Sequence, residues 1–116
     1  MWGVKVMSGN FHTSGYITES DLKNIVLEHN DKLNHKIKST LRKIHKIKRE
    51  NLVLSDKRYS KYLKLRKFDS TTLGFLDTFL EVLKISERIG KNGNKIQRLR
   101  TKISQLKKSL IPLVDE

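Results

Sequence analysis

Residues 96–110, IQRLRTKISQLKKSL, carry the strongest periodicity in the chain. Their apolar side chains recur at steps of three and four, which is the a/d spacing of a helix that packs along one seam. The apolar positions are Ile96, Leu99, Ile103, Leu106 and Leu110. Pro112 follows two residues later and is expected to end the helix. The stretch predicts a helix that needs a partner helix, either within the same chain or in another chain.

The segment before it, residues 71–89, is the most apolar part of the chain and is also expected to be helical. One stripe follows 3-4-3 spacing and consists of Leu73, Leu76, Leu80 and Leu83. A second stripe beside it contains Phe75, Phe79, Val82 and Ile89. A helix with two apolar stripes is expected to be buried from two directions and to sit centrally.

A turn is predicted between these two helices. Gly90 suits the left-handed position that ends many helices, and the sequence Lys91-Asn92-Gly93 favours a change of direction. Asn94 is a suitable cap for the helix that follows. A connection of about four residues predicts an antiparallel helical hairpin.

Upstream, neither glycine nor proline occurs between Tyr16 and Leu73, which favours long helices. Thr18 or Ser20 is a suitable first cap, and apolar residues from Leu22 to Ile47 recur at steps of three, four and seven. This pattern predicts a long amphipathic helix that either breaks near residues 52–56 or continues. Residues 68–72 predict a stop and a restart.

The predicted fold class is therefore all-α. It comprises a flexible N-terminal arm over residues 1–17, a long basic helical segment over residues 18–68, and a coiled-coil-like helical hairpin over residues 69–116. Three of the six glycines lie in the arm, with serine, threonine and asparagine between them.

Charge is unevenly distributed along the chain. The 116 residues contain 25 Lys and Arg against 12 Asp and Glu, a formal net charge of +13. Residues 32–67 alone carry 14 basic and 2 acidic side chains. A solvated helix face normally mixes signs, because opposite charges four residues apart stabilise a helix. The excess therefore indicates an anionic partner, with a merely solvated face as the alternative.

The candidate residues for binding that partner all lie in this segment. They are Lys32, Lys36, Lys38, Arg42, Lys43, Lys46, Arg49, Lys57, Arg58, Lys61, Lys64, Arg66 and Lys67. Lysine outnumbers arginine, which favours attraction to a phosphate backbone over bidentate contact with bases. Tyr59, Tyr62 and Phe68 lie among the basic residues and fit either stacking on a single strand or helix packing.

No pattern for catalysis, a cofactor or a metal is present. The chain lacks cysteine, and Glu28, Asp31 and His35 share one helix face without a second set of ligands. The Gly90–Lys95 stretch lacks the spacing of a phosphate-binding loop. No apolar run is long enough to span a membrane and no secretion signal is recognised, so the expected location is intracellular, nuclear or cytoplasmic.

These features predict a non-enzymatic assembly or adaptor subunit of a larger complex. It would dock through its helix seams onto partner helices, in a homo- or hetero-oligomer, and present its basic segment to an anionic partner. The alternative is an RNA- or DNA-binding protein, such as a ribosomal or nucleoprotein component. Attachment to a membrane surface is less favoured, because the apolar face of the long helix lacks Trp and Phe.

Overall fold

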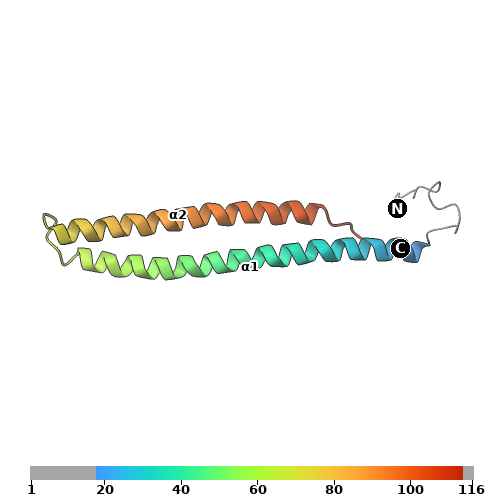
Figure 1. Ribbon diagram of the computed structural model, residues 1–116, viewed down its shortest axis with the longest axis horizontal. Helices are drawn as coiled ribbons and strands as arrows, with labels where there is room; N and C mark the ends of the chain where they lie inside the picture. Colours follow the sequence, from blue (N-terminus) through green and yellow to red (C-terminus); the bar gives the residue numbers. More distant parts are fainter. Residues whose placement is uncertain (1–17, 114–116) are drawn as a thin grey trace.

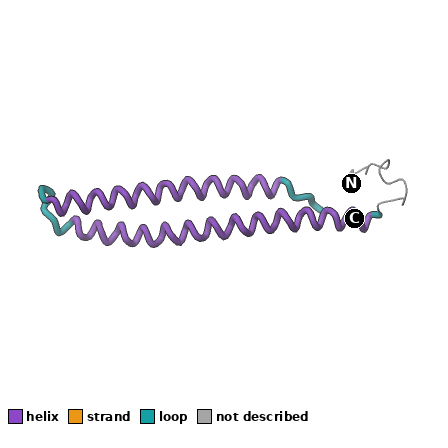
Figure 2. The backbone as a smooth tube through the Cα atoms, viewed as in Figure 1, coloured by secondary structure: helices purple, strands orange, loops and turns teal. Residues whose placement is uncertain are grey.

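The computed structural model describes residues 18–113, which form two long helices. Helix α1 spans Glu19–Leu65 and helix α2 spans Leu73–Lys108. They run antiparallel and lie side by side along their length (Figure 1). A short loop joins them at one end (Figure 2). The predicted all-α fold with a helical hairpin is confirmed, whereas the predicted arm at residues 1–17 lies outside the described residues.

Helix α1 begins at the predicted cap and runs without interruption. The Thr18 hydroxyl accepts a hydrogen bond from the Asp21 backbone N–H at 3.1 Å, and the Asp21 carboxylate accepts one from the Thr18 N–H at 3.2 Å. This reciprocal capping box satisfies two backbone donors at the helix start. No break occurs near residues 52–56, so the 47 residues of α1 extend about 70 Å.

The restart predicted at residues 68–72 is present. Helix α1 ends at Leu65, and the chain turns before Thr72 caps α2. The Thr72 hydroxyl accepts a hydrogen bond from the Phe75 N–H at 3.2 Å, and the Asp69 carboxylate accepts one from the Thr71 N–H at 3.1 Å. In both cases a side-chain oxygen accepts a hydrogen bond from a backbone N–H that has no helical carbonyl partner.

The turn predicted at residues 91–93 is wrong, because α2 passes through this segment as continuous helix. The hairpin therefore joins α1 to α2, and the expected separate helix over 71–89 is the first half of α2. Asn92 is 4% exposed, and its side-chain amide donates to the Asn51 side-chain oxygen on α1 at 2.8 Å. Ile96, one turn later, is also buried. This packing outweighs the roughly 1 kcal/mol that each glycine costs a helix.

Replacing Gly90 and Gly93 together by alanine tests whether this segment is helical, as in the structure, or forms the turn that the sequence predicts. A Cβ atom at either position meets nothing within 4 Å, and both residues lie within the helix. Alanine should therefore raise the free energy of unfolding by about 1–2 kcal/mol in total, because it is less flexible in the unfolded chain. Thermal unfolding followed by circular dichroism measures the change. A lower midpoint than that of the parent chain would favour the turn.

The two helices meet along a continuous seam of facing positions. Buried seam residues are spaced by three, four or sums of threes and fours along each helix. Those on α1 are Val26, Ile37, Thr40 and Ile44, and those on α2 are Thr78, Val82, Asn92, Ile96 and Ile103. The main apolar cluster is Ile37, Ile44, Ile96 and Ile103, with Ile47, Leu99, Leu106 and Leu110 packed against it. The 96–110 stripe thus faces α1.

The chain after α2 is held against the start of α1. The Asn30 side-chain amide donates to the Ile111 carbonyl oxygen at 2.7 Å and accepts from the Ile111 N–H at 2.9 Å. The His29 Nε2 atom lies 3.1 Å from the Ser109 carbonyl oxygen. These contacts satisfy backbone groups left free where α2 ends, just before Pro112.

Candidate anion-binding face

One edge of the hairpin is defined by contacts between the helices. Arg88 donates to Glu50 at 3.0 Å, and His29 approaches Ser109 at 3.1 Å. The two contacts are separated by the same number of residues, three heptads, along both helices. Packed helices repeat the same relative positions every seven residues. Counting in sevens from the Glu50–Arg88 contact, backward along α1 and forward along α2, therefore places Lys43 opposite Lys95 and Lys36 opposite Lys102. These four exposed lysines therefore form two like-charged pairs across the same edge.

The like-charged pairs belong to a larger region that we name the basic half, residues 32–49 of α1 and residues 88–113. It contains sixteen basic and no acidic residues. The helical parts of the two segments lie side by side, far from the loop (Figure 1). The rest of the described hairpin consists of residues 18–31, with one basic and four acidic residues, and of residues 50–87, which we name the turn half and which contain seven basic and six acidic residues. The positive charge is thus concentrated between the acidic start of α1 and the turn half.

The structure divides the predicted anion-binding residues between the two halves. Seven are exposed in the basic half: Lys32, Lys36, Lys38, Arg42, Lys43, Lys46 and Arg49. Four are exposed in the turn half, among acidic residues: Lys57, Lys64, Arg66 and Lys67. Arg58 and Lys61 instead lie half-buried toward α2, where Arg58 donates to the Ser86 hydroxyl at 3.1 Å and Lys61 pairs with Glu81. The thirteen residues therefore do not form one face.

Sequence reasoning missed the contribution of α2. The basic half also includes Lys48 of α1 and seven residues beyond Arg88, all of them exposed: Lys91, Lys95, Arg98, Arg100, Lys102, Lys107 and Lys108. The missing turn at residues 91–93 explains the omission, because a separate C-terminal hairpin would have kept these side chains apart from α1. A usable signal was present, since no acidic residue occurs between Arg88 and Leu113.

Glu50 and Glu81 are carboxylates of the turn half that form ion pairs across the two helices. Hydrogen bonding from Arg88, and then from Asn92, lowers the pKa of Glu50, and Lys95 adds attraction. A hydrogen bond from Lys61 lowers the pKa of Glu81. A lowered folded-state pKa means that the unfolded chain binds more protons in acid. Both pairs therefore stabilise the hairpin at neutral pH, and this contribution is lost as pH falls below the ordinary carboxyl range.

The other predicted stripe lies away from α1. Leu73, Leu76, Leu80 and Leu83 are 77%, 49%, 46% and 48% exposed, whereas Thr78 and Val82 occupy the seam in this part of α2. The stripe therefore lies on the face of α2 that points away from the seam, and its pairing with a helix of another chain stays a prediction.

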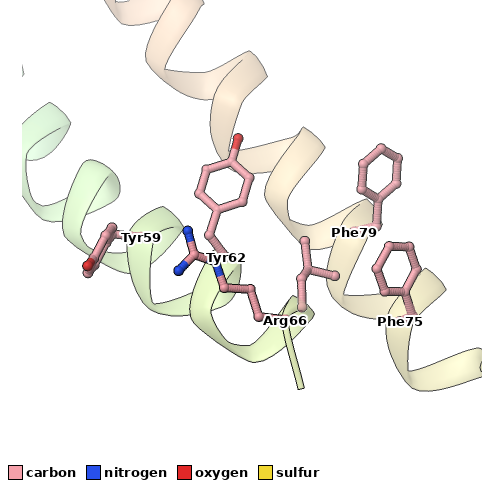
Figure 3. A pocket seen from close by; sticks show the side chains of 6 residues that line it. Tyr59, Tyr62, Arg66, Phe75 and Phe79 are labelled. Carbon is pink, nitrogen blue, oxygen red and sulfur yellow. The ribbon is translucent and has the colours of Figure 1, made fainter. Parts of the chain in front are cut away.

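A shallow groove lies beside the stripe, between the helices. Tyr59, Tyr62 and Arg66 line it from α1, and Phe75 and Phe79 line it from α2 (Figure 3). The two phenyl rings stack with their centres 6.2 Å apart. The groove lies in the turn half, so its aromatic side chains are separated along the hairpin from most of the basic residues.

Within residues 18–113, no group of three or more His, Asp or Glu side chains is placed to hold a metal ion. Glu28 instead lies 3.9 Å from Lys32, and Asp31 lies 3.4 Å from His35. Neither helix of the hairpin has an apolar stretch that would cross a bilayer. No family model, curated protein or solved structure matches this chain.

Proposed function

We propose that the protein is a non-enzymatic helical assembly subunit that presents the basic half to an anionic macromolecule. The observation that carries the proposal is the pairing of two helical segments with sixteen basic and no acidic residues between them. Such a concentration of one charge repels itself, and a polyanion relieves that repulsion on binding. The proposal includes an intracellular site of action, in the nucleus or cytoplasm.

The arrangement of the lysines supports a binding role over simple solvation. Glu50 and Arg88 form an ion pair across the edge that also carries the two like-charged lysine pairs. An acidic residue in place of Lys36 or Lys43 would form similar pairs, each contributing a few tenths of a kcal/mol. The hairpin is thus less stable than it would be with acidic residues at these positions, and all of the positions lie in the basic half.

Nucleic acid is the second candidate for the anionic partner, and the partner would then be bound through its phosphates. The basic half contains eleven lysines and five arginines. Lysine acts as a point charge and suits contact with a phosphate backbone, whereas sequence-specific contact with bases usually relies on bidentate hydrogen bonds from arginine. Binding would therefore be independent of sequence, as expected for a ribosomal or nucleoprotein component.

The test is binding of the full chain to four probes as salt is raised. Fluorescence anisotropy is measured with a 30-base-pair DNA duplex, a 30-nucleotide RNA strand and a poly-glutamate peptide, and flotation with vesicles containing phosphatidylserine. For the duplex, log K is expected to fall with log salt at a slope of about −0.9 per phosphate neutralised. The strongest probe identifies the partner class. Failure to bind any of the four at 50 mM salt would refute the proposal.

A further inference from the structure

The leucine stripe of α2 has the spacing of a helix seam but no helix against it. Leu73, Leu76, Leu80 and Leu83 follow 3-4-3 spacing and are each about half or more exposed. All four lie in the turn half. A stripe with this spacing packs best against another helix with the same spacing.

Charges flanking the stripe select the second copy of the chain as its partner. If two stripes pair in antiparallel orientation, Leu73 lies opposite Leu83 and Leu76 lies opposite Leu80. The helix positions that flank the seam then bring Asp77 of each copy opposite Lys84 of the other. Neither side chain makes an ion pair within residues 18–113. A two-fold axis near Thr78 therefore creates two complementary pairs.

The distribution of charge favours the same orientation. The turn half carries seven basic and six acidic residues, so two turn halves meet with little repulsion. Antiparallel pairing directs the two basic halves to opposite ends of the assembly. Parallel pairing would place them side by side, with sixteen positive charges on each.

We propose that two copies of this chain associate through the leucine stripes of their turn halves, in antiparallel orientation, with Asp77 facing Lys84 of the other copy. The contact is isologous, because the same residues are used by both copies. Such a short stripe is expected to form a small interface, so the association is expected to be weak and transient. The dimer presents two basic halves pointing in opposite directions.

Sedimentation equilibrium of the full chain from 5 to 500 μM tests the proposal. A monomer–dimer equilibrium is expected, and replacing Leu76 and Leu80 by glutamine should abolish it without changing helicity, since both side chains are about half exposed. Leu52→Gln on α1, which is 67% exposed, is the matched control and should dimerise normally. A parent chain that stays monomeric, or a double variant that still dimerises, would overturn the proposal.

A charge exchange tests the orientation. Asp77→Lys and Lys84→Asp should each weaken dimerisation about tenfold, because two favourable pairs become two repulsive ones. Mixing the two variants should restore a heterodimer in which both pairs are again complementary. Failure of the mixture to restore it would exclude the antiparallel arrangement. Higher salt should weaken the dimer only slightly, by screening the two Asp77–Lys84 pairs, but should weaken polyanion binding steeply, so either proposal can fail without the other.

Discussion

A chain in which Leu99, Ile103 and Leu106 are all replaced by alanine is expected to lose the hairpin. Ile103 is 8% exposed and belongs to the buried cluster, and the two leucines pack against that cluster from α2. Truncation of a buried leucine or isoleucine costs about 2–5 kcal/mol. Three such losses together are comparable to the roughly 5–15 kcal/mol by which ordinary domains are stable, and a two-helix structure has a thinner core than most.

The expected observation is a loss of most of the helical circular dichroism signal at 25 °C. Alanine is the best helix former, so any loss of helicity must come from the missing contacts with α1. The control replaces Leu27, Leu52 and Leu63 by alanine, three leucines of α1 that are 49%, 67% and 39% exposed. The control should stay folded. If the core variant kept its helicity and thermal midpoint, the seam described above would not be what holds the helices together.

Replacing Lys36, Lys43, Lys95 and Lys102 by glutamine is expected to weaken polyanion binding by roughly a hundredfold at 100 mM salt, because up to four phosphate contacts are removed. For a duplex, the slope of log K against log salt should become less steep by about 3–4. The same substitutions remove two repulsive pairs, so the hairpin should become slightly more stable. Loss of binding with a gain in stability is opposite to what damage to the fold would produce.

The matched control removes four charges from the turn half, at Lys57, Lys64, Arg66 and Lys67. These residues belong to the segment that the sequence alone suggested for anion binding, but they lie in the turn half, which also contains six acidic residues. The control should therefore retain most of the affinity. Equal losses in the two variants would mean that total charge governs binding and that the basic half has no special part in it.

Local signals predicted where each of the two helices begins. Thr18 and Thr72 cap the two helices because their hydroxyls satisfy backbone donors a few residues away, which is a short-range effect visible in the sequence. The 96–110 stripe lies in the seam for a similar reason, since its spacing alone puts all five apolar side chains on one helix face. Such features depend on neighbours within one or two turns.

The turn at residues 91–93 was predicted for the same local reasons, and there the prediction failed. Two glycines and an asparagine favour a turn when the segment is considered alone. In the hairpin, Asn92 bonds to Asn51, forty-one residues away, and Ile96 is buried in a cluster with residues of α1. Contacts between residues so distant cannot be inferred from local spacing, because they depend on where the chain has already turned.

By itself, the sequence determined that this protein is helical, where α1 begins and α2 restarts, and that it carries an excess of positive charge. Only the tertiary structure decided how that charge is arranged. Because α2 runs unbroken along α1, Lys95 and Lys102 lie opposite Lys43 and Lys36, and two separate basic segments become one half of the molecule. The physical reason is that charge is distributed by long-range packing, whereas helix formation is directed largely by local sequence.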